Sequence, residues 1–164
     1  MSLSSMKLYF LRHGQAEAIA PLDEMRALTE TGIAETEKML LWFKQQEPHI
    51  QNIFNSSYLR AQQSCQIVLN TLNFEGKAEE SSLITPHSDP IDFLKNILRR
   101  LTTDTLLVTH QPFMGKLMSY LISGYGGAKF PIETSALAMI EFKDNLVGLG
   151  SGQLVWLKNI KDLD

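Results

Sequence analysis

Short, almost wholly apolar runs alternate along this chain with longer segments in which apolar residues recur every three or four positions. The runs at 8–11 and 105–109 are typical of strands that are covered on both faces. The segment after residue 60 instead places Ala61, Cys65 and Val68 on one stripe of a helix. This alternation predicts an α/β fold, a three-layer sandwich with a mostly parallel central sheet flanked by helices.

The same pattern sets approximate bounds for the elements. We expect strands near 8–11, 52–55, 77–80, 105–109, 136–142 and 153–157, the last two forming an edge hairpin. Helices are expected at about 30–46, from residue 56 or 57 to about 72, from Asp89 or Asp92 to about 101, and from Pro112 onward. A chain of 164 residues suits one domain, 1–164, with residues 1–5 interpreted as an added or disordered tail before a native start near Met6.

Helix ends and buried faces are also open to prediction. Thr29 is a suitable N-cap for the first helix, and Ser56 or Ser57 for the second. Pro112 suits the first position of the fourth helix. The predicted buried face of the first helix consists of Ile33, Ala34, Leu40, Leu41 and Phe43.

Composition excludes several classes of function. The net charge of −3, and the lack of a basic run longer than Arg99-Arg100, argue against a nucleic-acid partner. A single cysteine, Cys65, excludes an internal disulfide and a paired-cysteine metal site, and we interpret it as a buried, inert thiol. No apolar stretch approaches the ~20 residues of a membrane span, and no signal peptide is visible. We expect a cytoplasmic protein that does not bind membranes.

Chemistry-bearing residues follow three of the predicted strands. Arg12-His13-Gly14 ends the first strand, His110 ends the strand at 105–109, and Arg60 lies in the first turn after the strand at 52–55. The tips of parallel strands are where ligands bind in such sheets, so these side chains should converge. Gly14 would let the chain turn sharply and approach a ligand closely. Arg60 taken alone could equally be a surface arginine in a salt bridge.

Two arginines with two histidines favour an oxyanion. Guanidinium groups are planar, permanently charged donors that match phosphoryl oxygens. The histidines supply a possible nucleophile and a further donor. A metal ion is disfavoured, because the arginines would repel it and no carboxylate accompanies the histidines at ligand spacing. The preferred ligand is therefore phosphate, with no metal.

Six short motifs in order resemble a known family. They are Leu11-Arg12-His13-Gly14, Arg26-Ala27-Leu28-Thr29 with Gly32, Ser57-Tyr58-Leu59-Arg60-Ala61-x-Gln63-Ser64, Leu83-x-Thr85-Pro86, Val108-x-His110-x-Pro112 and Thr134-Ser135-Ala136. The set resembles the histidine phosphatase superfamily, which includes phosphoglycerate mutases and acid phosphatases, and within it the small SixA-type phosphohistidine phosphatases. The third motif departs from the family pattern in carrying Ser64 where threonine is usual.

The resemblance implies a role for each of the four residues. His13 would be the nucleophile that forms a covalent phosphohistidine, with a backbone carbonyl fixing its tautomer. Arg12 and Arg60 would hold the phosphoryl oxygens. His110 would donate to the same group and stabilise the transition state. Water would then release inorganic phosphate, and no cofactor is implied.

The resemblance also draws attention to a missing acid. Larger members of the family carry a carboxylic acid that protonates an oxygen leaving group, and Glu79, Glu80 and Asp89 lie only in the rough region. General acid help is commonly worth 10²–10⁴-fold, so a site without it favours phosphohistidine, whose leaving group is an imidazole.

The predicted substrate is therefore a phosphorylated protein such as a histidine phosphotransfer domain, acted on by a monomer. The alternatives are a phosphatase for small phosphoesters or phosphosugars, and a non-catalytic phosphoprotein-binding module.

Overall fold

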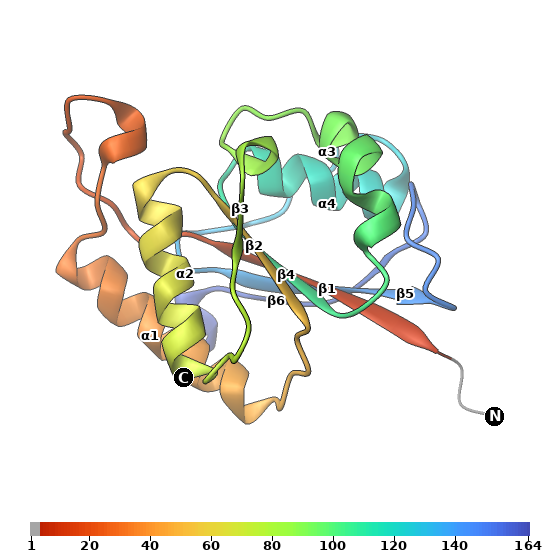
Figure 1. Cartoon of the computed structure of the whole chain (residues 1–164), viewed down its shortest axis with the longest axis horizontal. Coiled ribbons are helices and arrows are strands. Elements are labelled where there is room, and N and C mark those ends of the chain that lie inside the picture. The colour runs from red at the N-terminus through yellow and green to blue at the C-terminus, as the bar shows by residue number, and fades with distance from the viewer. Residues whose placement is uncertain (1–3) are drawn as a thin grey trace.

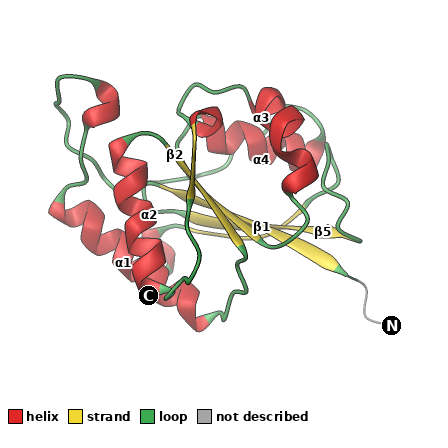
Figure 2. Cartoon of the chain, in the orientation of Figure 1, coloured by secondary structure: helices red, strands yellow, loops and turns green. Residues whose placement is uncertain are grey.

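A computed structural model, which describes residues 4–164, has a six-stranded sheet between two pairs of helices (Figures 1 and 2). The strands are β1 (Ser5–Arg12), β2 (Asn52–Ser56), β3 (Glu79–Ser81), β4 (Thr105–Thr109), β5 (Leu137–Lys143) and β6 (Gln153–Lys158). Their order is β3-β2-β4-β1-β5-β6. The first four in this order are mutually parallel, whereas β5 runs antiparallel to both of its neighbours, β1 and β6. The predicted three-layer α/β fold with a mostly parallel sheet is confirmed.

Both faces of the sheet are buried. In β1, Met6, Leu8 and Phe10 pack into one core, and Tyr9 and Leu11 pack into the other. Helices α3 (Pro90–Ile97) and α4 (Phe113–Ser123) cover the first face, and α1 (Glu30–Gln45) and α2 (Leu59–Thr71) cover the second (Figure 1). Alternate side chains of one strand thus enter opposite cores, which explains why the run Leu8–Leu11 of β1 is apolar without interruption.

The buried face of α1 differs from the prediction. Thr29 caps the helix as expected, its side chain accepting a hydrogen bond from the Gly32 N–H. Leu40 and Phe43 are buried as predicted, but Ile33, Ala34 and Leu41 are exposed. The residues that α1 buries are Gly32, Thr36, Met39, Leu40 and Phe43. Hydrophobicity alone misplaced the face because a glycine and a threonine, not isoleucine and leucine, form the contact of α1 with the end of β1.

Two of the predicted helix starts differ from the structure by one or two residues. The N-cap of α2 is Tyr58, which makes no side-chain cap; Ser56 belongs to β2, and its hydroxyl accepts from the Tyr58 N–H at 3.3 Å. Pro112 is the N-cap of α4 rather than its first helical residue, and Asp89 is the N-cap of α3.

The N-terminal prediction is partly wrong. Residues 1–3 lie outside the described part of the chain, but Ser5 is the first residue of β1 and pairs with Lys143 of β5. The Ser4 carbonyl accepts a hydrogen bond from Asp144. Ser4 and Ser5 therefore belong to the folded sheet. Within 4–164, no helix is long and apolar enough to cross a bilayer.

Three parallel strands end at one edge of the sheet. Arg12 of β1 lies opposite Thr109 of β4, and Asn55 of β2 lies opposite Val108. The same edge therefore carries Ser56, which ends β2, and the two histidines His13 and His110, which directly follow β1 and β4.

Candidate active site

His13 has a fixed backbone and a fixed ring. Its N–H donates to the Thr109 carbonyl at 3.0 Å, and its carbonyl accepts from the Ser135 N–H at 3.0 Å. Ring nitrogen Nδ1 lies 2.7 Å from the Gly14 carbonyl oxygen, which can only accept, so Nδ1 carries the proton. The other nitrogen, Nε2, therefore presents a lone pair. The predicted carbonyl partner of this ring is confirmed.

The surroundings of His13 keep the ring neutral. Burial lowers the pKa of His13 to about 4; the Gly14 hydrogen bond opposes this shift, and the charges of Arg60 and Arg12 add to it. At neutral pH the ring is consequently neutral, with Nε2 unprotonated and able to act as a nucleophile. An ordinary histidine, with a pKa near 6.5, is still partly protonated on both nitrogens at this pH.

Gly14 is required for packing rather than for an unusual backbone angle. Its φ is not in the left-handed region, but a Cβ here would lie 2.6 Å from the Thr36 hydroxyl and 2.7 Å from the Gly32 carbonyl oxygen. A Cβ on Gly32 would in turn overlap the Gln15 carbonyl oxygen. Two glycines thus let α1 press against the turn that carries His13. This close approach of α1 is a packing reason for glycine at position 14 that the sequence did not predict.

Arg60 is buried and is not a surface arginine. Only 3% of its surface is exposed, and its Nε donates to His13 Nε2 at 3.3 Å. The guanidinium lies 5.0 Å from the centre of the Tyr58 ring, a cation–π contact. Arg60 therefore places a permanent positive charge beside the unprotonated nitrogen of His13, which accepts its hydrogen bond.

Asp23 holds the far side of the Arg60 guanidinium. The Asp23 carbonyl accepts from Arg60 Nη1 at 2.8 Å, and its carboxylate lies 3.2 Å from Nη2. Arg26 contacts the same carboxylate at 2.8 Å. Partial burial would raise the pKa of Asp23, but the hydrogen bonds from the two arginines outweigh it and hold this pKa below its ordinary value. Asp23 is therefore ionised at neutral pH.

His110 packs against His13 with its ring centre 4.9 Å away. Its Nε2 lies 2.7 Å from the Ser56 hydroxyl, which already accepts from the Tyr58 N–H. This pattern favours a hydroxyl that donates to Nε2, and hence a proton on Nδ1. Burial, with the nearby His13 and arginine charges, lowers the pKa of His110 even further than that of His13. His110 is thus a neutral ring that can donate from Nδ1.

Arg12 completes the cluster. Its Nη1 donates to the Ile132 carbonyl at 2.8 Å, and burial together with the charge of Arg60 lowers its pKa without removing its charge. In the described chain, two buried side-chain nitrogens make no hydrogen bond, Arg12 Nε and His110 Nδ1. Both belong to residues of this cluster, and both are groups that a phosphoryl oxygen would satisfy.

The remaining motif residues hold this cluster in place. Ser64 accepts from the Gly14 N–H at 3.1 Å, and Gln63 accepts from the Leu28 N–H at 2.7 Å. The Ser135 hydroxyl bonds to Thr36 at 3.0 Å, and the Ala136 carbonyl accepts from the Arg12 N–H. These residues act through the backbone around His13.

The three carboxylates considered as acids are engaged elsewhere. Glu79 pairs with Arg100, and Glu80 accepts from the Gln62 amide at 2.6 Å. Asp89 caps α3 through the Ile91 N–H. Over residues 4–164, no group of three or more His, Cys, Asp or Glu side chains is arranged to hold a metal ion.

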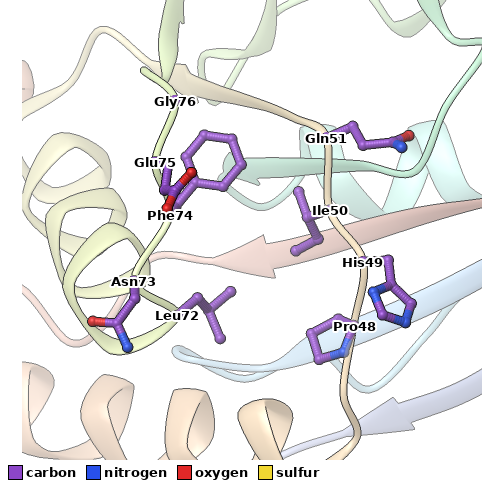
Figure 3. A pocket seen from close by; sticks show the side chains of 9 residues that line it. All are labelled: Pro48, His49, Ile50, Gln51, Leu72, Asn73, Phe74, Glu75 and Gly76. Atoms are coloured by element: carbon purple, nitrogen blue, oxygen red, sulfur yellow. The ribbon is translucent and has the colours of Figure 1, made fainter.

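A hollow of about 450 Å³ lies at the opposite end of β2 from Ser56. Pro48–Gln51 and Leu72–Gly76 line it (Figure 3). No lysine or arginine is among these residues, and His49 and Glu75 are its ionisable side chains. This hollow lacks the donors that a phosphoryl group needs.

Comparison with known proteins gives the family. The sequence model described as "Histidine phosphatase superfamily (branch 1)" matches residues 8–82. The Escherichia coli protein named phosphohistidine phosphatase SixA is 31% identical over 155 residues, covering 92% of each chain. The chain belongs to the histidine phosphatase superfamily.

Two further comparisons agree with this membership of the histidine phosphatase superfamily. A SixA homologue from Haemophilus influenzae is 30% identical over 71% of this chain and 77% of its own. The solved structure of the protein histidine phosphatase SixA complexed with tungstate superposes with a TM-score of 0.85 at 30% identity, covering 97% of this chain and 100% of that one. The fold and the family therefore extend over almost all of the sequence.

Sequence reasoning missed two contributors to the site. Ser56, treated as a helix cap, is the partner of His110, and no local signal in the sequence distinguishes these two roles. Asp23 lies in a loop whose contact with Arg60 has no local signature.

Proposed function

We propose that this protein is a phosphohistidine phosphatase that works through a phosphoryl group carried on His13. The observation that carries the proposal is the His13 ring, whose Nδ1 proton is held by the Gly14 carbonyl while Nε2 lies beside Arg60. A simple phosphate-binding module needs arginines but has no use for a neutral imidazole prepared for attack.

In the first step, the lone pair of His13 Nε2 forms a bond to phosphorus. The bond between phosphorus and the substrate imidazole breaks, and its electrons return to that imidazole, which leaves as a neutral ring if its other nitrogen is protonated. His13 becomes a positively charged phosphoimidazole, and the Gly14 carbonyl stabilises the proton on Nδ1. One P–N bond is exchanged for another.

The second step returns the enzyme to its starting state. Water bonds to phosphorus, the P–Nε2 bond breaks, and its electrons return to His13. Inorganic phosphate leaves, and the proton of the attacking water goes to phosphate or solvent. Arg12, Arg60 and the Nδ1–H of His110 provide donors for the phosphoryl oxygens in both steps.

The state of Asp23 supports phosphohistidine over a phosphoester. In the described chain, Asp23 is the carboxylate that hydrogen-bonds to the four-residue cluster, and its lowered pKa leaves it without a proton to donate. An alkoxide departing without a proton is a poor leaving group, whereas an imidazole whose other nitrogen already carries a proton leaves as a neutral ring and needs no acid from the enzyme. The relative named phosphohistidine phosphatase SixA, and the solved structure of SixA complexed with tungstate, a tetrahedral oxyanion, support the same assignment.

The test is phosphate release from a phosphorylated histidine phosphotransfer domain, compared with phosphoserine and small phosphate esters. We expect rapid release from phosphohistidine, little from the esters, and none above background with His13→Ala. Equal turnover by His13→Ala would refute the covalent role, and preference for an ester would move the function to small-molecule hydrolysis.

A further inference from the structure

One loop projects beside the active site. An antiparallel bridge joins Ala16 to Leu28, and the Glu17 N–H donates to the Ala27 carbonyl at 2.8 Å. The residues between these pairs, 18–26, which we call the rim loop, extend from the body of the molecule at the upper left of Figure 1. The short 3₁₀ helix Asp23–Met25 lies within it.

The rim loop contacts the phosphoryl-binding cluster directly. Asp23 holds the Arg60 guanidinium through both its carbonyl and its carboxylate. The loop is therefore the immediate border of the site, at a fixed distance from His13.

The same loop exposes three large apolar side chains. Ile19 is 89% exposed, Leu22 55% and Met25 49%. A hydrogen bond of 3.0 Å from the Met25 N–H to the Leu22 carbonyl closes one turn, which brings these two residues side by side. Neither large hydrophobic core includes any of the three. Grouped apolar residues that a fold leaves in water are typical of surfaces covered by a partner.

Geometry identifies the partner that would cover them. A histidine ring is separated from its backbone by a single methylene group, so the backbone of a protein substrate must come within one side-chain length of His13. The partner surface around that histidine must then lie on the border of the site, next to Asp23. A small phosphorylated molecule would end at the site and leave the rim loop uncovered.

Charge does not offer an alternative driving force. Asp23 pairs with both Arg26 and Arg60, and Glu24 is the remaining charged side chain of residues 18–26. One exposed carboxylate repels an acidic partner and offers a basic partner a single weak ion pair, so apolar contact is the main interaction that the loop can supply.

We propose that Ile19, Leu22 and Met25 form a docking surface for a protein substrate that carries an apolar patch beside its phosphohistidine. This inference rests on the proposed function. The residues dock the substrate and take no part in the chemistry.

The test compares two triple variants on two substrates. The first carries Ile19→Ser, Leu22→Ser and Met25→Ser. The control carries Leu146→Ser, Leu149→Ser and Val155→Ser, whose native residues are similarly exposed at 67%, 55% and 47%. Leu146 and Leu149 follow Lys143, which pairs with Ser5 at the end of the sheet away from His13. The substrates are a phosphorylated histidine phosphotransfer domain and phosphoramidate, a small P–N compound.

We expect kcat/KM of the rim-loop variant on the phosphorylated domain to fall about tenfold or more, mainly through KM, because a buried apolar anchor commonly contributes at least that much. Its kcat/KM on phosphoramidate, and both values for the control variant, should stay within about twofold of wild type.

Other results would overturn the proposal. Unchanged activity on the domain would show that the loop does not dock it. An equal loss on both substrates would show that the loop only supports Arg60. Concentration-dependent dimerisation of the wild type, abolished in the rim-loop variant, would assign the surface to a second copy of this chain. A wild type that hydrolyses phosphoramidate but not the phosphorylated domain would instead remove the proposed function itself.

Discussion

At the residue scale, the site depends on which nitrogen of each histidine carries its proton. His13 presents a lone pair because Gly14 holds its Nδ1–H, and His110 presents an N–H because Ser56 occupies its Nε2. Because each histidine directly follows a predicted parallel strand, the sequence was sufficient to predict that the two histidines lie close together. It did not reveal the partner of His110, because a serine at a strand end is indistinguishable from a helix cap until the strands are paired.

The low pKa of His13 predicts the acid limb of the pH profile. His13 attacks only when unprotonated, and its pKa of about 4 keeps it so at all higher pH values. We expect kcat/KM on phosphoramidate, corrected for uncatalysed hydrolysis, to be flat from pH 7.5 to about 5 and to fall as pH approaches 4. A half-maximal point near 6.5, the ordinary value for histidine, would contradict the burial argument.

Ser56→Ala removes the partner of His110 without touching the phosphoryl group. We expect kcat to fall roughly tenfold, the value of one hydrogen bond of about 1.4 kcal/mol, with little change in KM. The ¹⁵N chemical shifts of His110 should show a change in tautomer population. Ser119→Ala, which removes another fully buried hydroxyl, is the control. A wild-type kcat in Ser56→Ala would exclude a positioning role.

At the element scale, α1 can lie close to the turn that carries His13 because two residues at the contact, Gly14 and Gly32, have no side chain. Its first turn presses against Gly14 and Gln15 through Gly32, and Thr36 continues the contact. The sequence did predict the helix and its Thr29 cap, since these are local signals. It predicted the buried Leu40 and Phe43 but not the start of the buried face, because a hydrophobicity pattern counts Gly32 as neutral and Ile33 as buried. A hydrophobicity pattern therefore does not predict where a helix packs closely against a catalytic turn.

Gly32→Ala tests this contact. Alanine improves helix propensity by about 1 kcal/mol, but its Cβ would overlap a backbone oxygen that cannot move without displacing the His13 turn. We expect a net loss of about 1–3 kcal/mol in the free energy of unfolding, measured with urea, together with reduced kcat.

Gly115→Ala in α4 is the matched control. The nearest neighbour of its Cβ is the end of the Gln111 side chain at 3.0 Å, which can rotate away. Gly115→Ala should therefore be less destabilising than Gly32→Ala. Equal stability of the two variants would contradict the proposed role of the Gly32 contact.

At the scale of the whole molecule, four parallel strands bring distant parts of the chain to one edge of the sheet. The alternation of apolar runs was enough to predict this architecture. The strand order β3-β2-β4-β1-β5-β6 was not predictable in the same way, because pairing depends on long-range contacts that no local pattern encodes. A loop at 17–27 over the top of the sheet was predictable from its irregular pattern, but its contact with the site was not, since Asp23 and Arg60 lie 37 residues apart.

Burying two neutral histidines makes global stability depend on pH. Both have folded-state pKa values below the unfolded value near 6.5, so between pH 6.5 and about 4 the unfolded chain binds protons that the folded protein does not. Stability should therefore fall as pH decreases through this window, with each histidine contributing up to about 1.4 kcal/mol per pH unit.

Urea unfolding at pH 6.5 and pH 5 measures this slope. His13→Asn should reduce it, and the same change at the exposed His49 should not. A slope unaffected by His13→Asn would show that burial does not lower the pKa of His13 in the folded state.

The most direct test of the central claim is to trap the phosphorylated enzyme. The wild-type protein would be mixed with a phosphorylated histidine phosphotransfer domain, quenched in alkaline denaturant within milliseconds, digested and analysed by mass spectrometry. The account predicts one acid-labile phosphoryl group on His13, formed and lost at rates consistent with turnover and absent from His13→Ala. Turnover with no phosphoryl group on His13 at any time, or with the group on another residue, would contradict it.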